Sequence, residues 1–245
     1  MRQRSLGYQL AMQRLGMMLE LAPRPYIGLQ RLRSSRKGYA GHIVAPGDAL
    51  VIEAYPRSGS SFALRAFRQC NPDLAGRVGT HIHSAAHVTE AVRLGVPALV
   101  LIRTPDQAVP SLVALGIQTG TVVPRDSAQS LRMVRLALDR YIRFHRALLA
   151  LAERVAVADF SQVISDFGQV IARVNDRFGT DFAVFDHKPE AVDAILRRSR
   201  RHLGPDPDRE TVKERLQATY RCDEMASRRA EALALYQRLR VADAG

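Results

Sequence analysis

The sequence contains no tryptophan and only two cysteines in 245 residues. Cys70 and Cys222 lie far apart and fit neither a CxxC motif nor a zinc-binding spacing, so we expect two packing residues in a reducing compartment. Aromatic residues make up only 6% of the chain, and no known nucleic-acid-binding motif is present. A base-stacking platform for nucleic acid is therefore disfavoured, and no nucleic-acid partner is expected.

Long hydrophobic runs are also missing. The longest apolar stretch, Val96 to Ile102, is far shorter than the roughly 20 residues that a membrane-spanning helix needs. The first 20 residues are interrupted by polar side chains and lack the apolar region of a secretory signal. With 47% hydrophobic and 24% charged residues, the chain is predicted to be a globular cytoplasmic protein with a sizeable core.

Lysine is scarce, but positive charge is not. Three of the 36 basic residues are lysines, and the formal net charge is +12. Such a charge attracts anionic ligands, whether nucleotides, nucleic acid or acidic lipid. Any anion-binding loop in this chain must depend on arginine.

Strand and helix patterns alternate along the chain. Buried strands are expected at 49–55, 78–83, 98–102 and 154–158, with helices between them and across the C-terminal third. This alternation predicts an α/β fold of three α/β/α layers around a parallel sheet of about four or five strands. We expect one domain, 1–245, with a helical extension (1–45), a nucleotide-binding core (46–185) and C-terminal helices (186–245). Ligands of such sheets bind beyond the carboxyl ends of the strands.

The loop after the first strand has the composition of an anion-binding loop. Its small residues, between Tyr55 and Phe62, allow successive backbone N–H groups to converge at a helix N-terminus. The candidate ligands of a phosphate-like group are Arg57, Ser58, Gly59, Ser60, Ser61 and Phe62. The loop lacks the lysine of a Walker A motif, which weakens ATPase and GTPase interpretations.

A second candidate anion site follows the strand at 98–102. Arg103 leaves the carboxyl end of that strand, and Ser111 falls on the next helix, so a guanidinium and a hydroxyl are available to a second phosphate. Thr104, with Pro105 and Gln107 after it, predicts a capping box at the start of this helix. Two anion sites on one sheet imply a bisphosphorylated ligand.

These two motifs, in this order, resemble those of the sulfotransferase family, which uses 3′-phosphoadenosine 5′-phosphosulfate (PAPS) as donor. The segment from Tyr55 to Phe62 is similar to the family's 5′-phosphosulfate loop, and looks most like that of carbohydrate sulfotransferases. Arg103 and Ser111 match the family's 3′-phosphate motif, and the segment 157–160 looks like the family's segment near adenine. The resemblance implies a P-loop-like topology, PAPS as donor co-substrate and no required metal.

Two departures from the family pattern concern the 3′-phosphate. Pro110 is expected to bend the helix that presents Ser111. The C-terminal Arg-Lys-Gly segment of the cytosolic members is not found. A group of arginines offers a substitute, although a solvated basic helix face is the favoured interpretation: Arg197, Arg198, Arg200 and Arg201.

A histidine cluster follows the strand expected at 78–83. The resemblance makes His81 the best match to the family's catalytic base and His83 the alternative, and both would share one face of that strand. Glu53 is a further candidate base, although a side chain directed into the sheet edge or into a salt bridge is the simpler interpretation. A zinc site of His81, His83 and His87 is disfavoured by its spacing, and His87 is interpreted as merely a polar residue at the start of a helix.

The resulting prediction is sulfuryl transfer from PAPS to an acceptor hydroxyl or amine on a small molecule, carbohydrate or lipid. Arg57 would stabilise charge on the leaving phosphate, and His81 or His83 would take the acceptor's proton. A P-loop-type nucleotide or small-molecule kinase and a non-catalytic basic module remain as alternatives. The arginine-rich segment 12–37 allows contact with a membrane surface, although a helix packed on the domain is the favoured interpretation. Acceptor choice is expected to depend on 116–126 and 186–207.

Overall fold

Four parallel strands form the centre of the molecule, in the spatial order β2-β1-β3-β4. The structure is a computed structural model that describes residues 7, 15–37, 42–121, 124, 126–197 and 207–242. The strands are β1 (Leu50–Ala54), β2 (Val78–Thr80), β3 (Ala98–Ile102) and β4 (Ala156–Asp159). The connections from β1 and from β3 leave toward opposite edges of the sheet, so the carboxyl ends of these two strands form its topological switch point.

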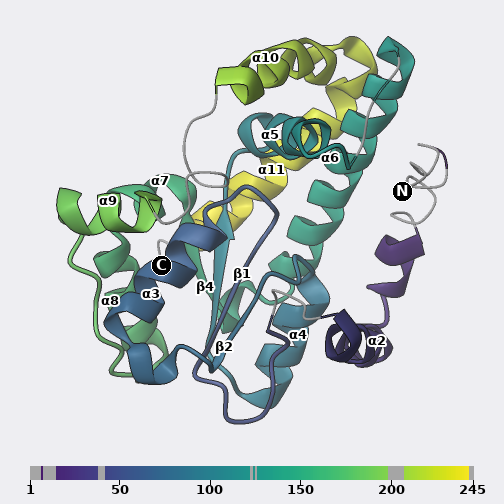
Figure 1. Cartoon of the computed structure of the whole chain (residues 1–245). Coiled ribbons are helices and arrows are strands. Elements are labelled where there is room, and N and C mark those ends of the chain that lie inside the picture. Colours follow the sequence, from purple (N-terminus) through teal and green to yellow (C-terminus); the bar gives the residue numbers. More distant parts are fainter. Residues whose placement is uncertain are drawn as a thin grey trace.

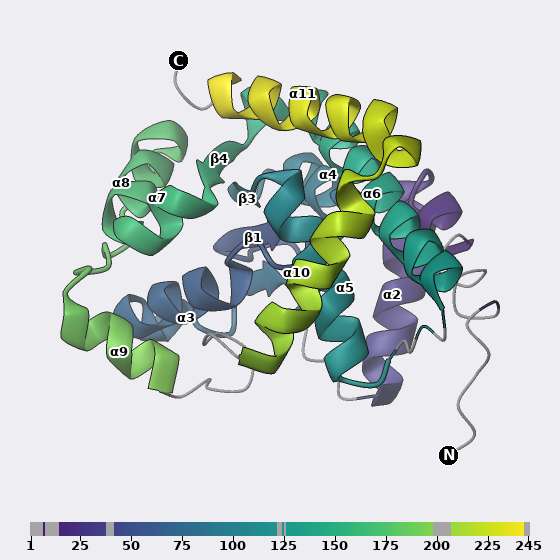
Figure 2. The ribbon, with the colours of Figure 1, turned by 90° about the horizontal axis from the view of Figure 1, so that it is seen from above.

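Helices cover both faces of this sheet (Figures 1 and 2). On one side lie α3 (Ser60–Cys70), α7 (Phe160–Ser165), α8 (Phe167–Phe178) and α9 (Pro189–Arg197). On the other lie α2 (Pro23–Lys37), α4 (Ala85–Leu94), α5 (Pro105–Gln118) and α6 (Ser127–Leu149), with α10 (Pro207–Arg221) and α11 (Ala226–Ala242) packed against α5 and α6. The predicted three-layer α/β/α architecture with a helical C-terminal part is confirmed.

Side-chain alternation along the strands builds a separate core on each face. Val51, Val100 and Ile102 pack with α4, α5 and α6, whereas Ile52 and Leu101 pack with α3 and α8. Every residue of β1 and β3 is buried, as expected of strands covered on both faces. The carboxyl end of the sheet is therefore held rigidly from both sides.

Local capping signals explain several helix boundaries. The Ser84 side chain accepts a hydrogen bond from the Ala86 amide at the start of α4, and Gly95 ends the helix in the left-handed conformation. Two helices, α7 and α8, meet at Asp166, whose carboxylate caps α8. The capping box predicted at Thr104 was wrong: its side chain makes no capping bond, and the chain's capping box lies at Asp159.

The strand expected over 78–83 is shorter than predicted. β2 ends at Thr80, and both His81 (φ 60°) and His83 (φ 54°) adopt left-handed backbone conformations that a strand does not contain. The prediction that the two histidines share a strand face was therefore wrong. Their rings are nevertheless neighbours, with centroids 5.6 Å apart in an edge-to-face arrangement.

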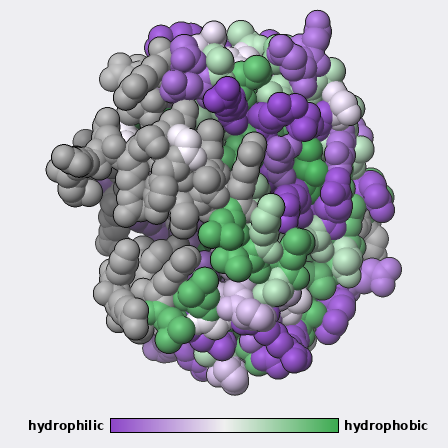
Figure 3. Space-filling model, turned by 90° about the vertical axis from the view of Figure 1, so that its right-hand side faces the viewer, coloured by the Kyte–Doolittle hydropathy of each residue, from purple (hydrophilic) through white to green (hydrophobic). Residues whose placement is uncertain are grey.

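The described part of the N-terminal segment packs on the domain through α2. Tyr26 and Ile27 of α2 are buried against Ile82 and Ala86. Figure 3 shows hydrophobic side chains gathered on this side of the molecule, and the exposed apolar residues of the segment are Leu15, Met18, Leu19, Leu21 and Leu32. Residues 12–14 of the segment for which membrane contact was considered lie outside the described residues. No helix in the described ranges has the length and hydrophobicity to cross a membrane.

Both cysteines are unpaired, half-buried residues. Cys70 on α3 and Cys222 after α10 pack against the two different cores. This agrees with the packing role expected from their spacing.

Candidate active site

The loop from Tyr55 to Phe62 joins β1 to α3 at the carboxyl end of the sheet. Arg57 (φ 73°) and Gly59 (φ 93°) both have left-handed backbones, which turns the chain sharply into the helix. A Cβ atom at Gly59 would lie 3.2 Å from the Phe160 ring and would also be strained by the positive φ. Glycine is thus required both by the turn and by the close approach of α7.

The N-terminus of α3 is open. Its N-cap, Gly59, provides no side-chain hydrogen bond, and the first intrahelical bond runs from the Ala63 amide to the Gly59 carbonyl. The amides of Ser60, Ser61 and Phe62 precede that bond and have no acceptor within the helix. They form a set of donors that suits an anion.

The helix that follows β3, α5, also lacks a side-chain cap, but it has fewer free amides. Its first residue, Pro105, has no N–H, and the Gln107 amide donates to the Thr104 carbonyl, which leaves the Asp106 amide without an acceptor in the helix. Neither α3 nor α5 has a side-chain cap, whereas serine or aspartate side chains cap α4, α6, α7 and α8. The two uncapped helices begin at the switch point of the sheet, where a ligand is expected.

A buried hydroxyl in the loop also lacks a partner. The Ser58 side chain is completely buried, and its Oγ forms no hydrogen bond within the structure. A buried hydroxyl without a partner is costly, and this one lies between Arg57 and the open helix end. Its chemistry fits a phosphate or sulfate oxygen.

Three of the predicted anion-binding residues come together. Arg57 Nε donates to Ser111 Oγ at 3.1 Å, and Arg103 Nη1 donates to the Arg57 carbonyl at 2.9 Å. The loop after β1 is thereby tied to both candidate residues of the second site. Pro110 lies inside α5, which continues to Gln118, so the proline does not prevent Ser111 from reaching the loop.

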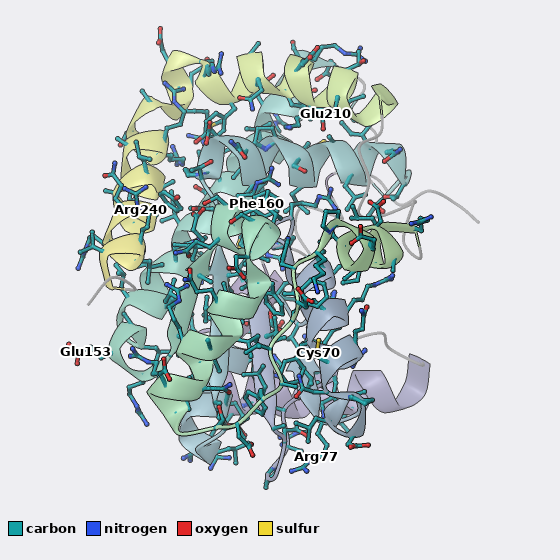
Figure 4. All side chains as sticks on the ribbon, turned by 90° about the vertical axis from the view of Figure 1, so that its left-hand side faces the viewer. Cys70, Arg77, Glu153, Phe160, Glu210 and Arg240 are labelled. Carbon is teal, nitrogen blue, oxygen red and sulfur yellow. The ribbon has the colours of Figure 1, made fainter. Side chains whose placement is uncertain are left out.

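Arg103 is held by three further contacts. Its Nε and Nη2 donate to Gln107 Oε1, and its guanidinium lies 4.0 Å from the centroid of the Phe160 ring. Phe160 is labelled in Figure 4 near the middle of the face, between Glu210 on α10 and Cys70 on α3. Burial, partly offset by Asp106, lowers the pKa of Arg103 from its usual value. The side chain is fixed before any ligand binds.

Glu53 is the centre of a buried hydrogen-bond network, and sequence analysis, which considered a salt bridge here, did not identify its backbone donors. Its Oε1 accepts from the Ile82 amide (2.8 Å) and from His87 Nδ1 (2.8 Å), and its Oε2 from the amides of His83 (3.0 Å) and Ala54 (3.2 Å). Burial disfavours ionisation, but the bond from His87 and the surrounding donors hold the pKa of Glu53 below its usual value. With four donors and no exposure, Glu53 is not placed to act as a base.

The two candidate bases differ in how their ring nitrogens are engaged. His83 Nδ1 donates to the Ala54 carbonyl at 2.9 Å, which leaves Nε2 as the proton-accepting nitrogen of the neutral ring. His81 contacts hydroxyls with both nitrogens: Nδ1 lies 2.9 Å from Thr80 Oγ1, and Nε2 lies 3.2 Å from Ser61 Oγ. Burial, together with the neighbouring His83, lowers the pKa of His81.

His87 points away from the other two histidines. Its Nε2 accepts from the Val44 amide at 2.8 Å, so its Nδ1 carries the ring proton that Glu53 receives. Both nitrogens are thus occupied, and the three imidazoles do not converge on a metal. No group of metal-ligating side chains occurs in the part of the chain that the structure describes. His87 lies near the start of α4 as expected, but it is completely buried and bonded at both nitrogens, so it has a structural role that the sequence did not indicate.

Of the C-terminal arginines considered for the 3′-phosphate, one lies among the residues that the structure describes. Arg197 is exposed at the end of α9 and is paired with Asp193. Arg198, Arg200 and Arg201 lie outside the described residues. At the segment expected near adenine, the Tyr236 hydroxyl donates to Asp159 at 2.6 Å and so joins α11 to the end of β4.

A search of solved structures finds a match in the mouse sulfotransferase SULT7A1 complexed with PAP. The match has a TM-score of 0.53 and 12% sequence identity, and covers 82% of this chain and 90% of the other. No protein-family model matches the chain, and neither does any curated protein sequence. The structural likeness concerns the fold, and the chain has the α/β fold of a sulfotransferase.

Proposed function

We propose that this protein is a sulfotransferase that moves a sulfuryl group from PAPS to an acceptor. The observation that carries the proposal is the pair of uncapped helices, α3 and α5, at the switch point of the sheet, with Arg57 and Arg103 between them. Two anion sites joined by two arginines suit a ligand with two separated phosphate groups. The fold match to a sulfotransferase complexed with PAP supports the same ligand.

The donor would be held by both sites. The amides of Ser60, Ser61 and Phe62, with Ser58 Oγ, would bind the 5′-phosphosulfate, and Arg103 with Ser111 would bind the 3′-phosphate. The buried, unpartnered Ser58 Oγ supports this placement, because it needs an acceptor that the protein does not supply. Arg57 would lie between the two ends of the donor.

The reaction follows from these positions. The acceptor oxygen attacks the sulfur in line, the bond between sulfur and the bridging phosphate oxygen breaks, and that oxygen leaves with the electron pair. Arg57 would stabilise the charge that appears on the leaving phosphate. His83 Nε2 would take the acceptor proton, because the Ala54 carbonyl already binds its Nδ1 proton. His81 remains the second candidate base, with the closer resemblance in sequence.

Calorimetric titration tests the donor site directly. Adenosine 3′,5′-bisphosphate should bind more tightly than AMP or ADP. Equal binding of all three nucleotides would contradict the proposal and favour a kinase, which would bind only the 5′-phosphates. Absence of binding by any of them would favour a non-catalytic basic module.

A further inference from the structure

A cavity of about 420 Å³ lies beside the candidate site, between residues 16–20, α5 and α6. This volume falls in the range of small-molecule sites. Its walls are mainly apolar and come from both helices and from the N-terminal segment, with Met17, Leu112, Leu115, Met133 and Leu136 as the large side chains. Part of the lining, from Gly116 to Thr121, falls in the region expected to select the acceptor.

One charged side chain connects this cavity to the histidines. Arg140 lines the cavity, and its Nη2 donates to the His83 carbonyl at 3.1 Å. Glu20 also lines the cavity and lies within the influence of the Arg140 charge. The polar end of the cavity therefore contains Arg140 and Glu20, and Arg140 links it to the His83 backbone.

These charges interact with each other and with the backbone. Burial raises the pKa of Glu20, and the positive charge of Arg140 partly offsets that rise. Arg140 is bound to the His83 carbonyl. A sugar in this cavity would bury many hydroxyls against Leu and Met side chains, each at a cost when unpaired. An alkyl or ring body would bury no such groups.

We propose that the cavity binds the acceptor, and that the acceptor is an alcohol with an apolar body whose hydroxyl lies at the His83 end. This inference rests on the sulfotransferase function proposed above and narrows it. It disfavours the carbohydrate acceptor that the loop resemblance suggested. The segment 16–20 contributes Gly16, Met17 and Glu20 to the cavity wall, so it belongs to the acceptor site.

The absence of tryptophan permits a direct binding measurement. Leu115→Trp places a single indole in the cavity wall, and Leu233→Trp places one on the exposed surface of α11 as the matched control. Indole emission is followed while butanol, hexanol and octanol are titrated, with glucose as the polar probe. Affinity reported by Leu115→Trp should rise on the order of tenfold for each two added methylenes, whereas glucose should cause no saturable change.

A second binding measurement uses the wild-type protein, so that its result does not depend on the tryptophan variants. Saturation-transfer NMR with octanol should give a signal that adenosine 3′,5′-bisphosphate does not displace, because the two ligands occupy different sites. Labelled sulfate should then pass from PAPS to octanol and not to glucose.

The outcomes separate the two proposals. Binding of octanol and of the bisphosphate without sulfate transfer leaves the apolar site standing and contradicts the proposed reaction. Binding of the bisphosphate with no saturable octanol signal in either protein overturns the cavity assignment and leaves the donor site intact. Equal octanol responses of Leu115→Trp and Leu233→Trp would also overturn it, because they would report only nonspecific association.

Discussion

The Glu53 carboxylate on β1 accepts a 2.8 Å hydrogen bond from His87 Nδ1 on α4, and both side chains are completely buried. The Val44 amide fixes the other nitrogen of His87, and the remaining carboxylate positions bind the amides of Ile82 and His83. One carboxylate therefore connects β1, α4 and the loop that carries the two candidate bases. That loop has two left-handed non-glycine residues, which persist only where the surroundings hold them.

Glu53→Gln should destabilise the protein and disturb catalysis through the histidine loop. Glutamine places an NH₂ group against backbone donors that the carboxylate accepts, so we expect a loss of about 2–4 kcal/mol in the free energy of unfolding. Turnover should fall while bisphosphate affinity changes little. Denaturant unfolding, calorimetry and an activity assay measure the three effects.

Glu90→Gln is the matched control for Glu53→Gln. Glu90 is also a glutamate of low exposure, but its carboxylate binds Arg93 on the same helix and does not contact the histidine loop. Turnover should stay near that of wild type. If Glu53→Gln left turnover unchanged, the network would serve stability alone.

Arg103→Ala should remove most of the preference for adenosine 3′,5′-bisphosphate over AMP. Its charge-assisted hydrogen bonds are worth roughly 1.5–3 kcal/mol, which corresponds to about 10–100-fold in affinity. Gln107→Ala is the control, because it removes the side chain that accepts hydrogen bonds from the Arg103 guanidinium but leaves Arg103 itself in place. A preference retained by Arg103→Ala would show that another group binds the 3′-phosphate.

Arg57→Ala should lower turnover more than nucleotide affinity. Its charge matters most when the bridging oxygen becomes negative, and loss of one such group commonly costs on the order of 100–1,000-fold in rate. Ser111→Ala removes the hydroxyl that Arg57 Nε binds and should mainly weaken nucleotide binding. Near-normal turnover of Arg57→Ala in a steady-state assay would show that a group other than Arg57 stabilises the charge on the leaving phosphate.

His83→Ala should reduce sulfate transfer roughly 100–10,000-fold with bisphosphate binding almost intact. His81→Ala is the paired variant, and its smaller effect would follow from contacts of both its nitrogens with hydroxyls. The reverse order, with His81→Ala as the inactive variant, would support the base indicated by the family resemblance. Two active variants would mean that the cluster is structural.

His145 should make the protein less stable in mild acid. Burial lowers its pKa from 6.5 to about 4, only partly offset by its bond to the Tyr141 carbonyl. As the pH falls below 6.5, the unfolded chain therefore binds a proton at His145 that the folded protein does not bind. The free energy of unfolding is highest above pH 6.5 and declines as the pH falls toward 4. The total loss is on the order of 3 kcal/mol.

Urea unfolding across this pH range, with His145→Phe as the comparison, measures that effect. The phenylalanine has no titrating nitrogen and keeps an aromatic ring against Tyr141, on which His145 stacks at 3.7 Å. Its unfolding free energy should change less between pH 6.5 and 4 than that of wild type. If the unfolding free energies of the two proteins changed equally with pH, His145 would not be the group that lowers stability in acid.

The segments that form the candidate anion sites could be identified from local sequence. The Ser/Gly loop, its place between a buried strand and a helix, and Arg103 at the next strand end are all local signals, and the alternation of strand and helix patterns was enough to predict the layered α/β fold. Helix caps at Ser84 and Gly95 were predictable for the same reason, since a cap depends on neighbours within a few residues.

The features that depend on residues far apart in the sequence could be determined only from the tertiary structure. Sequence analysis considered Glu53 as a candidate base or as a member of a salt bridge, whereas its role depends on amides about 30 residues away. Those bonds end β2 at Thr80 and turn the two histidines off the strand, which the pattern of side chains did not reveal. The cavity likewise depends on three segments that meet only when the chain folds. Periodicity and capping report neighbours along the chain, whereas the network and the cavity are formed by long-range contacts.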